Sequence, residues 1–502
     1  MLESYNDISN RAGRPDKPSA YKSLVYASAA VWICGMLSAL IAFGTFRTEA
    51  VTGSMDHAVR CTLGFAIGAP LTICLCRLMA GKLWSAPLCI IVSSLTALMF
   101  IGISINMAGY LEVPGASWEM PGLAPYSDPA TIYYWADRYV HGYEMPGCMS
   151  MGPLMFYGTF FRMFGTGLLA PLVFNAACMS LSVTTCGVIC ARLVEGGSDS
   201  RKAWAGALLM AMIPSIPYYG SILMKEAPVT LGFTLMSLPL AGIYTGRFKF
   251  RDLAWGGAGA VLLMALKPHT GYLLCAGAIL CLVNARRRQL GSKACAYNGT
   301  LAMLLLSLAI VAGGRAGRSD SDFLLLDSSR AQESEKTMLH HEAVGNYDSF
   351  VNGYYAKSPA EKAVYLPVAA AAQYFPPFPW NYTRDSHLAR FVPVAHLSFL
   401  WYMVGGMVLA WFALCMPFRD KAGGLRLWAL FWAGCYLGVA YMSAGSVARY
   451  HLPFMALCVP LALDFLTKVI RGGISRKKAS VFGAIYITLL ITGLALAYNF
   501  LV

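Results

Sequence analysis

The sequence predicts an all-α polytopic membrane protein with about 13 transmembrane helices and two large loops on the outer face. Three observations support this fold class. Of the 502 residues, 57% are hydrophobic and only 13% are charged, which is more apolar surface than a soluble protein of this size can cover. Apolar runs long enough to cross a bilayer recur from residue 21 to residue 502. The charges between these runs are also distributed unequally.

The net charge of +14 is concentrated on one predicted side of the membrane. With the N-terminus inside, the inner segments carry 24 Lys and Arg against 8 Asp and Glu, whereas the outer segments carry 15 against 17. This positive-inside asymmetry explains the basicity without a nucleic-acid partner. The clusters 286–288 and 476–478 are interpreted as cytoplasmic anchors. Membrane lipids are therefore expected partners, and nucleic acid is not.

Cysteine usage and the N-terminus add further limits. The 15 Cys lie mostly inside apolar runs, where they behave as small hydrophobic residues, and no pair has zinc-ligand spacing. We therefore predict neither a disulfide framework nor a structural metal, and no cofactor. The first 20 residues lack the apolar core of a cleavable signal, so the first span is expected to direct membrane insertion itself.

The predicted spans follow from runs of about 20 apolar residues. They lie at 23–44, 61–79, 84–107, 167–191, 203–223, 227–245, 253–266, 270–284, 296–314, 396–417, 425–443, 451–469 and 479–500. The pair from 253 to 284 is short and flanks Lys267-Pro268-His269, which predicts a broken or re-entrant helix pair.

Four units follow from this order of elements. Residues 1–83 form a cytoplasmic N-terminus with two spans, and 84–314 form a seven-span module whose first outer loop is 108–166. Residues 315–395 form the second large outer loop, and 396–502 hold the last spans. The aromatic and proline-rich stretch at 374–380 in that second loop suits the membrane–water boundary.

A small set of polar residues falls at the outer ends of the predicted spans. Ionisable groups near membrane depth are costly and mark a functional site by default. Cations at three separate turns, with acids in a flanking loop, would bind an anionic headgroup through charge-assisted hydrogen bonds. A carboxylate beside them would serve as a general base. The candidates are Asp128, Asp137, Lys225, Glu226, Lys267, His269, Arg449, Tyr450 and His451.

Each candidate has a structural alternative. Asp128 precedes Pro129, which is a good helix N-cap followed by proline at the first helical position. Asp137 is consistent with a solvated acid or a structural pair, and Lys225 and Glu226 with side chains that pair with each other or extend toward water. Lys267 and Arg449 are consistent with ordinary residues of the outer interface. The run 340–342, His-His-Glu, invites a metal interpretation, but the side chains of adjacent residues diverge, so no metal ligand is predicted there.

The loop and the later turns resemble the GT-C superfamily of membrane glycosyltransferases that use polyprenyl-phosphate sugars. Residues 128–142 read D-x4-YY-x-A-D-x3-HG and residues 152–165 read GP-x3-Y-x3-F-x2-FG, which is similar to the first-loop pattern of that family. LMALKPHTG at 263–271 and ARYHLPF at 448–454 resemble its Lys-containing break and its late Arg-Tyr segment. The resemblance implies that Asp128 is the catalytic acid of the loop. It also implies lipid-phosphate binding by Lys225, Lys267 and Arg449.

The expected function is transfer of a sugar from a polyprenyl-phosphate donor to an acceptor glycan, lipid or protein, with inversion in a single displacement. The expected location is the bacterial inner membrane, with the site on the periplasmic face. Three alternatives remain open at this point: a polysaccharide polymerase or ligase of the O-antigen type that uses a diphosphate-linked glycan, a lipid-linked sugar flippase or transporter, and a non-catalytic assembly subunit.

Overall fold

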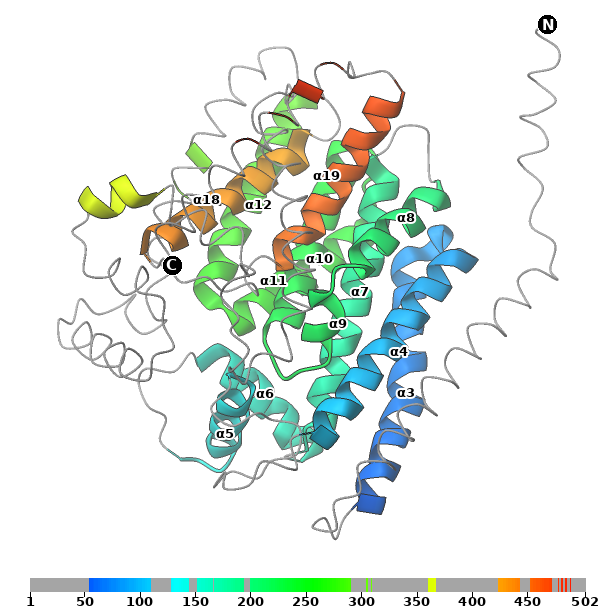
Figure 1. The fold of residues 1–502 in the computed structure, drawn as a ribbon. Helices are drawn as coiled ribbons and strands as arrows, with labels where there is room; N and C mark the ends of the chain where they lie inside the picture. Colours follow the sequence, from blue (N-terminus) through cyan, green and yellow to red (C-terminus); the bar gives the residue numbers. More distant parts are fainter. Residues whose placement is uncertain are drawn as a thin grey trace, which may run out of the picture.

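The structure is a computed structural model, and it describes about half of the chain (Figure 1). The described residues are 54–109, 128–143, 151–165, 167–193, 199–289, 360–366, 423–442 and 452–471, with isolated positions at 304, 305, 308, 477, 480, 481, 484 and 488. Within this part the elements are helices, with no strand. The predicted spans 23–44 and 396–417 lie outside it, and those at 296–314 and 479–500 enter it only at isolated positions.

The prediction of an all-α membrane protein is confirmed at this level. Among the described residues, five helical segments are long and apolar enough to cross a membrane, namely Gly64–Leu83, Ala86–Ile103, Leu169–Leu193, Glu226–Tyr244 and Leu452–Ile470. The helices are α3 (Ser54–Ala80), η1 (Gly81–Leu83), α4 (Ala86–Gly109), α5 (Asp128–Val140), α6 (Met151–Phe164), α7 (Leu169–Leu193), α8 (Ser200–Ala211), α9 (Ser215–Gly220), α10 (Glu226–Tyr244), α11 (Phe250–Leu266), α12 (Pro268–Gln289), α18 (Gly423–Met442) and α19 (Leu452–Ile470).

Helices α7 and α10 form the centre of the bundle. They pack against each other, and α3, α4, α8, α11 and α19 surround them. Glycines allow the close contacts, because a Cβ at Gly232 of α10 would lie 2.9 Å from the carbonyl oxygen of Gly259 in α11. Hydroxyl groups inside the bundle are also satisfied, as the 2.9 Å contact between the Thr96 and Ser180 side chains shows.

The prediction of one continuous span at 203–223 is wrong. The stretch 203–223 contains α8 and the six-residue α9 instead, with a break between Ala211 and Ser215. The cause is local, because Pro214 and Pro217 lack the N–H that a continuing helix needs and their rings clash with the preceding turn. The following residues 221–225 then form a short connection into α10.

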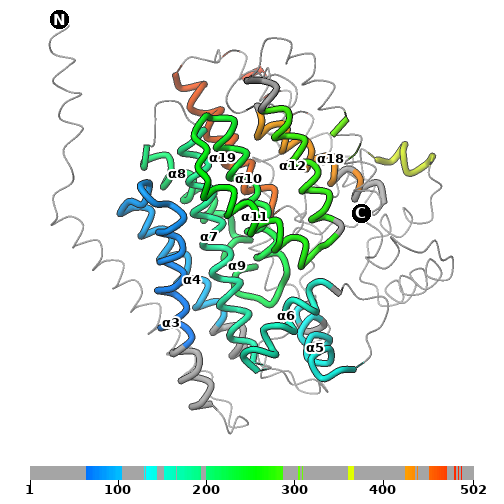
Figure 2. The backbone as a smooth tube through the Cα atoms, turned by 180° about the vertical axis from the view of Figure 1, so that it is seen from behind, coloured from blue at the N-terminus to red at the C-terminus, as the bar shows by residue number. Residues whose placement is uncertain are grey.

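The predicted break at Lys267 is confirmed. Helix α11 ends at Leu266 and α12 begins at Pro268, so a single residue separates two helices. Lys267 has φ −141° and ψ 77°, which is outside the helical region, and the following Pro268 disfavours a helical conformation at this position. Seen from behind, α6 lies close to this bend, and α5 lies beside α6 (Figure 2).

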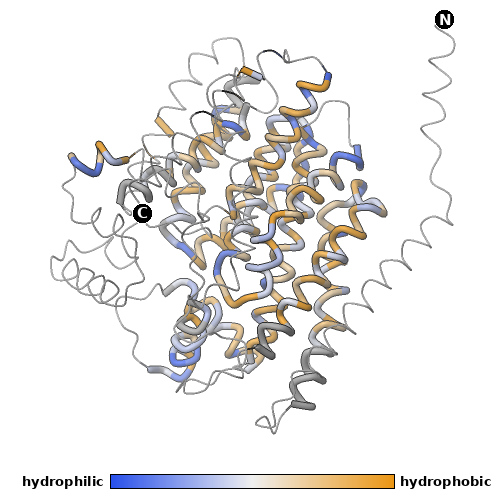
Figure 3. Tube along the Cα trace, in the orientation of Figure 1, coloured by the Kyte–Doolittle hydropathy of each residue, from blue (hydrophilic) through white to orange (hydrophobic). Residues whose placement is uncertain are grey.

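Two polar ends result from this arrangement, as the hydropathy colouring also shows (Figure 3). The first, called the basic end below, gathers cations from η1, the ends of α7 and α19, the start of α8, the α10–α11 loop and the first turn of α11. Its members are Lys82, Arg192, Lys202, Arg247, Lys249, Arg251 and Arg471. The second, called the Lys267 end, holds Lys225, Glu226 and Lys267. Helix α10, with 19 residues, separates the two ends by about 28 Å.

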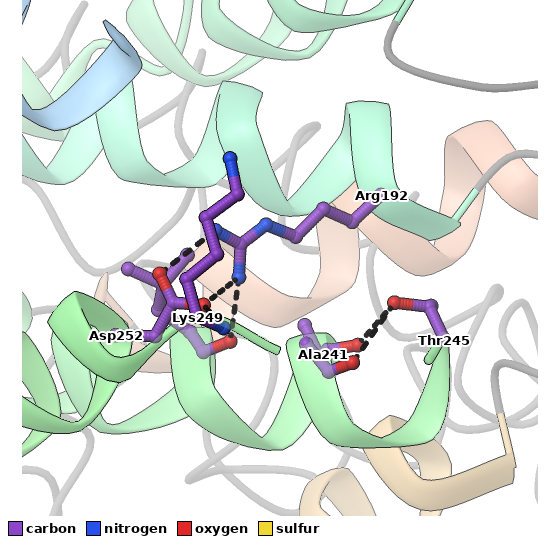
Figure 4. A network of polar contacts seen from close by, with 7 residues as sticks. Arg192, Ala241, Thr245, Lys249 and Asp252 are labelled. Atoms are coloured by element: carbon purple, nitrogen blue, oxygen red, sulfur yellow. Dashed lines mark hydrogen bonds and ion pairs between the residues drawn. The ribbon is translucent and has the colours of Figure 1, made fainter. Parts of the chain in front are cut away.

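A buried ion pair closes the bundle at the basic end. Arg192 of α7 donates from its two terminal nitrogens to the two carboxylate oxygens of Asp252 in α11, at 2.9 Å each (Figure 4). The Arg192 side chain is 7% exposed and that of Asp252 is 1% exposed. Arg192 also donates to the carbonyl oxygen of Leu238 in α10 at 3.3 Å. Three helices therefore meet at one bidentate pair.

Replacing one partner of this pair should destabilise the protein strongly. Asp252→Ala leaves the Arg192 charge buried without its carboxylate, which costs about 3–5 kcal/mol. The joint replacement Arg192→Met with Asp252→Leu should cost much less. Unfolding of the detergent-solubilised protein, followed by circular dichroism, measures both. Asp137→Ala, at the more exposed pair with His141, serves as a control with a small effect. Equal stability of Asp252→Ala and the native protein would contradict the role of the pair.

Candidate functional site

The turn before α10 brings one cation and one acid to the Lys267 end. Lys225 is the N-cap residue of α10 and Glu226 is its first residue. A carboxylate in the first turn of a helix is favoured by the positive end of the helix dipole. Glu226 is 3% exposed, and its carboxylate lies within the range of charge–charge interaction with both Lys225 and Lys267. The sequence predicts these two lysines at separate outer turns. In the structure they flank the same buried carboxylate.

The backbone at the helix break holds Lys267 in place. Its N–H donates to the carbonyl oxygen of Leu263 at 2.8 Å, and its own carbonyl accepts from the N–H of Gly271, also at 2.8 Å. A Cβ at Gly271 would lie 2.8 Å from backbone atoms of Met264, so the first turn of α12 packs directly on the last turn of α11. The position of Lys267 is consequently set by both helices.

A buried hydrogen-bond network holds the turn that precedes Lys225, through the backbone carbonyl groups of Ile222 and Met224. The side-chain amide of Asn175, in α7, donates to the carbonyl oxygens of Ile222 at 2.8 Å and Met224 at 3.1 Å. The Tyr157 hydroxyl, in α6, lies 3.1 Å from the Asn175 side-chain oxygen and 2.9 Å from the Met224 carbonyl oxygen, and its one proton serves either acceptor. Both side chains are fully buried. The network therefore joins α6, α7 and the residues just before Lys225.

Sequence reasoning missed Tyr157 and Asn175 as part of this site. A signal for each was present in the sequence. Tyr157 is the tyrosine of the GP-x3-Y pattern at 152–157, and Asn175 is an amide within the apolar run of α7. Tyr157 also lies within electrostatic range of Glu226. Their contact joins positions 18 residues apart on different helices, so only the folded structure shows it.

The hairpin of α5 and α6 lies against the same end of the bundle. Helix α6 begins beside the last residues of α11, because a Cβ at Gly152 would lie 2.6 Å from the carbonyl oxygen of Leu266. Helix α5 packs on α6, with the rings of Tyr133 and Phe161 5.2 Å apart. Asp128 is the first residue of α5, and its side chain lies outside the described part of the structure.

The remaining predicted residues stand as follows. Asp137 lies on α5, and its carboxylate is 3.5 Å from Nδ1 of the exposed His141, one helical turn away. His269 lies in the first turn of α12, and its side chain is outside the described residues. Arg449, Tyr450 and His451 are also outside them, immediately before the first residue of α19.

The direction of α19 follows from the positions of its two ends. Arg471 follows the last residue of α19 and interacts electrostatically with Lys202 at the basic end. The first residue of α19, Leu452, is fully buried and lies at the other end of a 19-residue helix. The chain therefore enters α19 from the side on which the Lys267 end lies.

Comparisons with known proteins do not place the chain. No family model matches it, and no curated protein and no solved structure matches it either. Among the residues that the structure describes, no three His, Cys, Asp or Glu side chains are grouped so as to hold a metal ion. The site is therefore interpreted from its own residues.

Loss of the amide network should loosen the Lys225 turn. Asn175→Leu leaves the carbonyl oxygens of Ile222 and Met224 buried without their donor, at about 1–3 kcal/mol each, whereas Tyr157→Phe removes one hydrogen bond, at about 1 kcal/mol. Hydrogen exchange of residues 221–226, followed by mass spectrometry, should accelerate more for the Asn175 variant. Tyr272→Phe, at an exposed position, is the matched control. Unchanged exchange in both variants would show that the network does not hold the turn.

Proposed function

We propose that this protein is an integral membrane glycosyltransferase of the GT-C kind, which transfers a sugar from a polyprenyl-phosphate donor to an acceptor at the outer face. One observation carries the proposal. Lys225 and Lys267, from two separate helix junctions, flank the buried Glu226 at the end of the bundle opposite the basic end. The hairpin that begins at Asp128 lies against this same end.

The charges of this group suit a lipid phosphate. Two lysines and one carboxylate carry a net charge of about +1 when all are ionised, so the group attracts an anion. Ammonium groups bind phosphate oxygens through charge-assisted hydrogen bonds. Glu226 is the first residue of the apolar segment Glu226–Tyr244. In this proposal that end of the segment meets the headgroup layer, where the phosphate of a membrane-embedded donor lies. In this proposal Arg449, Tyr450 and His451 complete the phosphate site, together with His269.

The proposed reaction is a single displacement at the anomeric carbon. The Asp128 carboxylate takes the proton of the acceptor hydroxyl while that oxygen forms a bond to the anomeric carbon. The bond from this carbon to the phosphate oxygen breaks, and the phosphate leaves with the bonding electrons. Lys225 and Lys267 stabilise the charge that develops on the leaving phosphate. Attack opposite the leaving group inverts the anomeric centre. In this proposal Asp137, on α5, is the second catalytic acid of the loop.

The orientation of the protein in this proposal follows from the positive-inside rule. The basic end would face the cytosol, and the Lys267 end would face the periplasm of a bacterial inner membrane. The order of α4, the α5–α6 hairpin and α7 to α12 supports a GT-C-like module with its first large loop after the first span. The thirteen spans and the four units predicted from the sequence remain part of this proposal.

Removal of the loop acid should abolish transfer while leaving donor binding intact. Asp128→Asn removes the base, so the turnover number should fall by about 10²- to 10⁴-fold. The measurement is transfer from a radiolabelled polyprenyl-phosphate sugar by the purified protein, with donor binding followed separately. Asp199→Asn, at the N-cap of α8 near the basic end, is a matched acid-to-amide control and should retain turnover. Native turnover by the Asp128 variant would remove this residue from the mechanism.

A further inference from the structure

A short loop at the basic end alternates cations with exposed aromatic rings. Residues 247–251 read Arg-Phe-Lys-Phe-Arg. They comprise the last three residues of the connection between α10 and α11 and the first two residues of α11, and are called the 247–251 loop below. The side chains of Phe248 and Phe250 are 43% and 83% exposed. Aromatic rings that alternate with Lys and Arg suit the boundary between headgroups and acyl chains, where rings contact lipid and cations contact phosphate.

The loop is held in one conformation by the buried ion pair beneath it. The N–H of Lys249 donates to the Asp252 carboxylate at 2.9 Å, and the same carboxylate binds Arg192. The N–H of Arg247 donates to the Gly242 carbonyl at 2.7 Å. Thr245 donates to the Ala241 carbonyl at 2.7 Å, which ties the last turn of α10 (Figure 4). The Lys249 ammonium points away from the ion pair between Arg192 and Asp252 (Figure 4). It can therefore contact an anion outside this pair.

Cations from four other elements lie near this loop, namely from η1, from α7, from α8 and from the end of α19. Lys249 interacts electrostatically with Arg251, Arg192 and Lys82. Lys202 interacts with Arg471 and Arg247. Burial, followed by the repulsion of these neighbouring cations, lowers the pKa of both Lys249 and Lys202, and the acids Asp252 and Asp199 oppose this only in part. Like charges held this close together favour a bound anion.

An apolar stripe runs along α11 directly from this loop. Leu253 and Val261 are 51% and 63% exposed, and they follow Phe250 at helical spacing on one face. Gly257 lies between them with nothing within 4 Å of the position of a Cβ. The stripe therefore continues from the cations along a face of α11 that is exposed at Phe250, Leu253 and Val261. One lipid could place its headgroup at the cations and an acyl chain along this face.

We propose that the loop 247–251, with Lys82, Lys202 and Arg471, binds the phosphate headgroup of an anionic phospholipid, and that the stripe Phe250, Leu253, Gly257 and Val261 holds one of its acyl chains. This site lies at the end of the bundle opposite Lys267 and does not depend on the proposed transfer reaction. The exposed rings favour a lipid over a soluble phosphate, because a soluble anion would leave them in water.

The test measures lipid binding to the full-length protein by native mass spectrometry after addition of phosphatidylglycerol or phosphatidylcholine. The native protein should retain phosphatidylglycerol in preference to phosphatidylcholine. The double variant Lys249→Gln with Arg251→Gln should bind phosphatidylglycerol about 25-fold more weakly. Each Lys or Arg near an anionic lipid surface raises the binding affinity about fivefold, and the variant lacks two of them. Arg162→Gln, an exposed arginine on α6, should bind like the native protein.

A second variant separates the lipid from a soluble anion and avoids the charged network. Phe250→Ser changes a side chain that is 83% exposed, so the fold should persist while phosphatidylglycerol retention falls several-fold. Equal retention by the native protein and the double variant would overturn the site. A native affinity for inorganic pyrophosphate equal to that for phosphatidylglycerol, with both unaffected by Phe250→Ser, would overturn the assignment to a lipid.

Discussion

A charged side chain is costly in the hydrocarbon of a bilayer, and this cost divides the described part of the protein into two polar ends joined by an apolar bundle. Two sets of polar groups inside the bundle are paired with each other, namely the bidentate contact between Arg192 and Asp252 and the amide network of Asn175. The two ends differ in character. One exposes cations to the surface, whereas the other holds lysines around the buried Glu226.

Helix α10 runs from the Lys267 end to the basic end and so joins the two sites. Its first residue, Glu226, belongs to the candidate transfer site, and its last turn leads into the loop of alternating aromatic and basic residues. Helix α11 returns from that loop to the break at Lys267. A lipid bound at the basic end and a donor bound at the other end would therefore contact the two ends of the same helix pair. The close packing of Gly232 against Gly259 keeps these two helices in a fixed register.

Most of the helix positions could be predicted from apolar runs, because a membrane span is encoded locally by length and hydropathy. The predicted spans at 167–191 and 227–245 fall within two residues of α7 and α10. The error at 203–223 arose because hydropathy does not register the backbone effect of Pro214. The predicted topology placed Lys225 and Lys267 at outer turns on the same side of the membrane, whereas their common interaction with Glu226 comes from the structure. The roles of Tyr157 and Asn175 could not be predicted, since they depend on a contact between two different helices.

The most direct test of the account is the distance between the loop acid and the helix break. Spin labels attached through non-natural side chains, which avoids the 15 native cysteines, would be placed at 128, 267 and 249 and measured in pairs by pulsed electron paramagnetic resonance. The account predicts a 128–267 distance well below the 128–249 distance, because α10 separates the two ends by about 28 Å. A label at 128 that lies as close to 249 as to 267 would contradict a shared site.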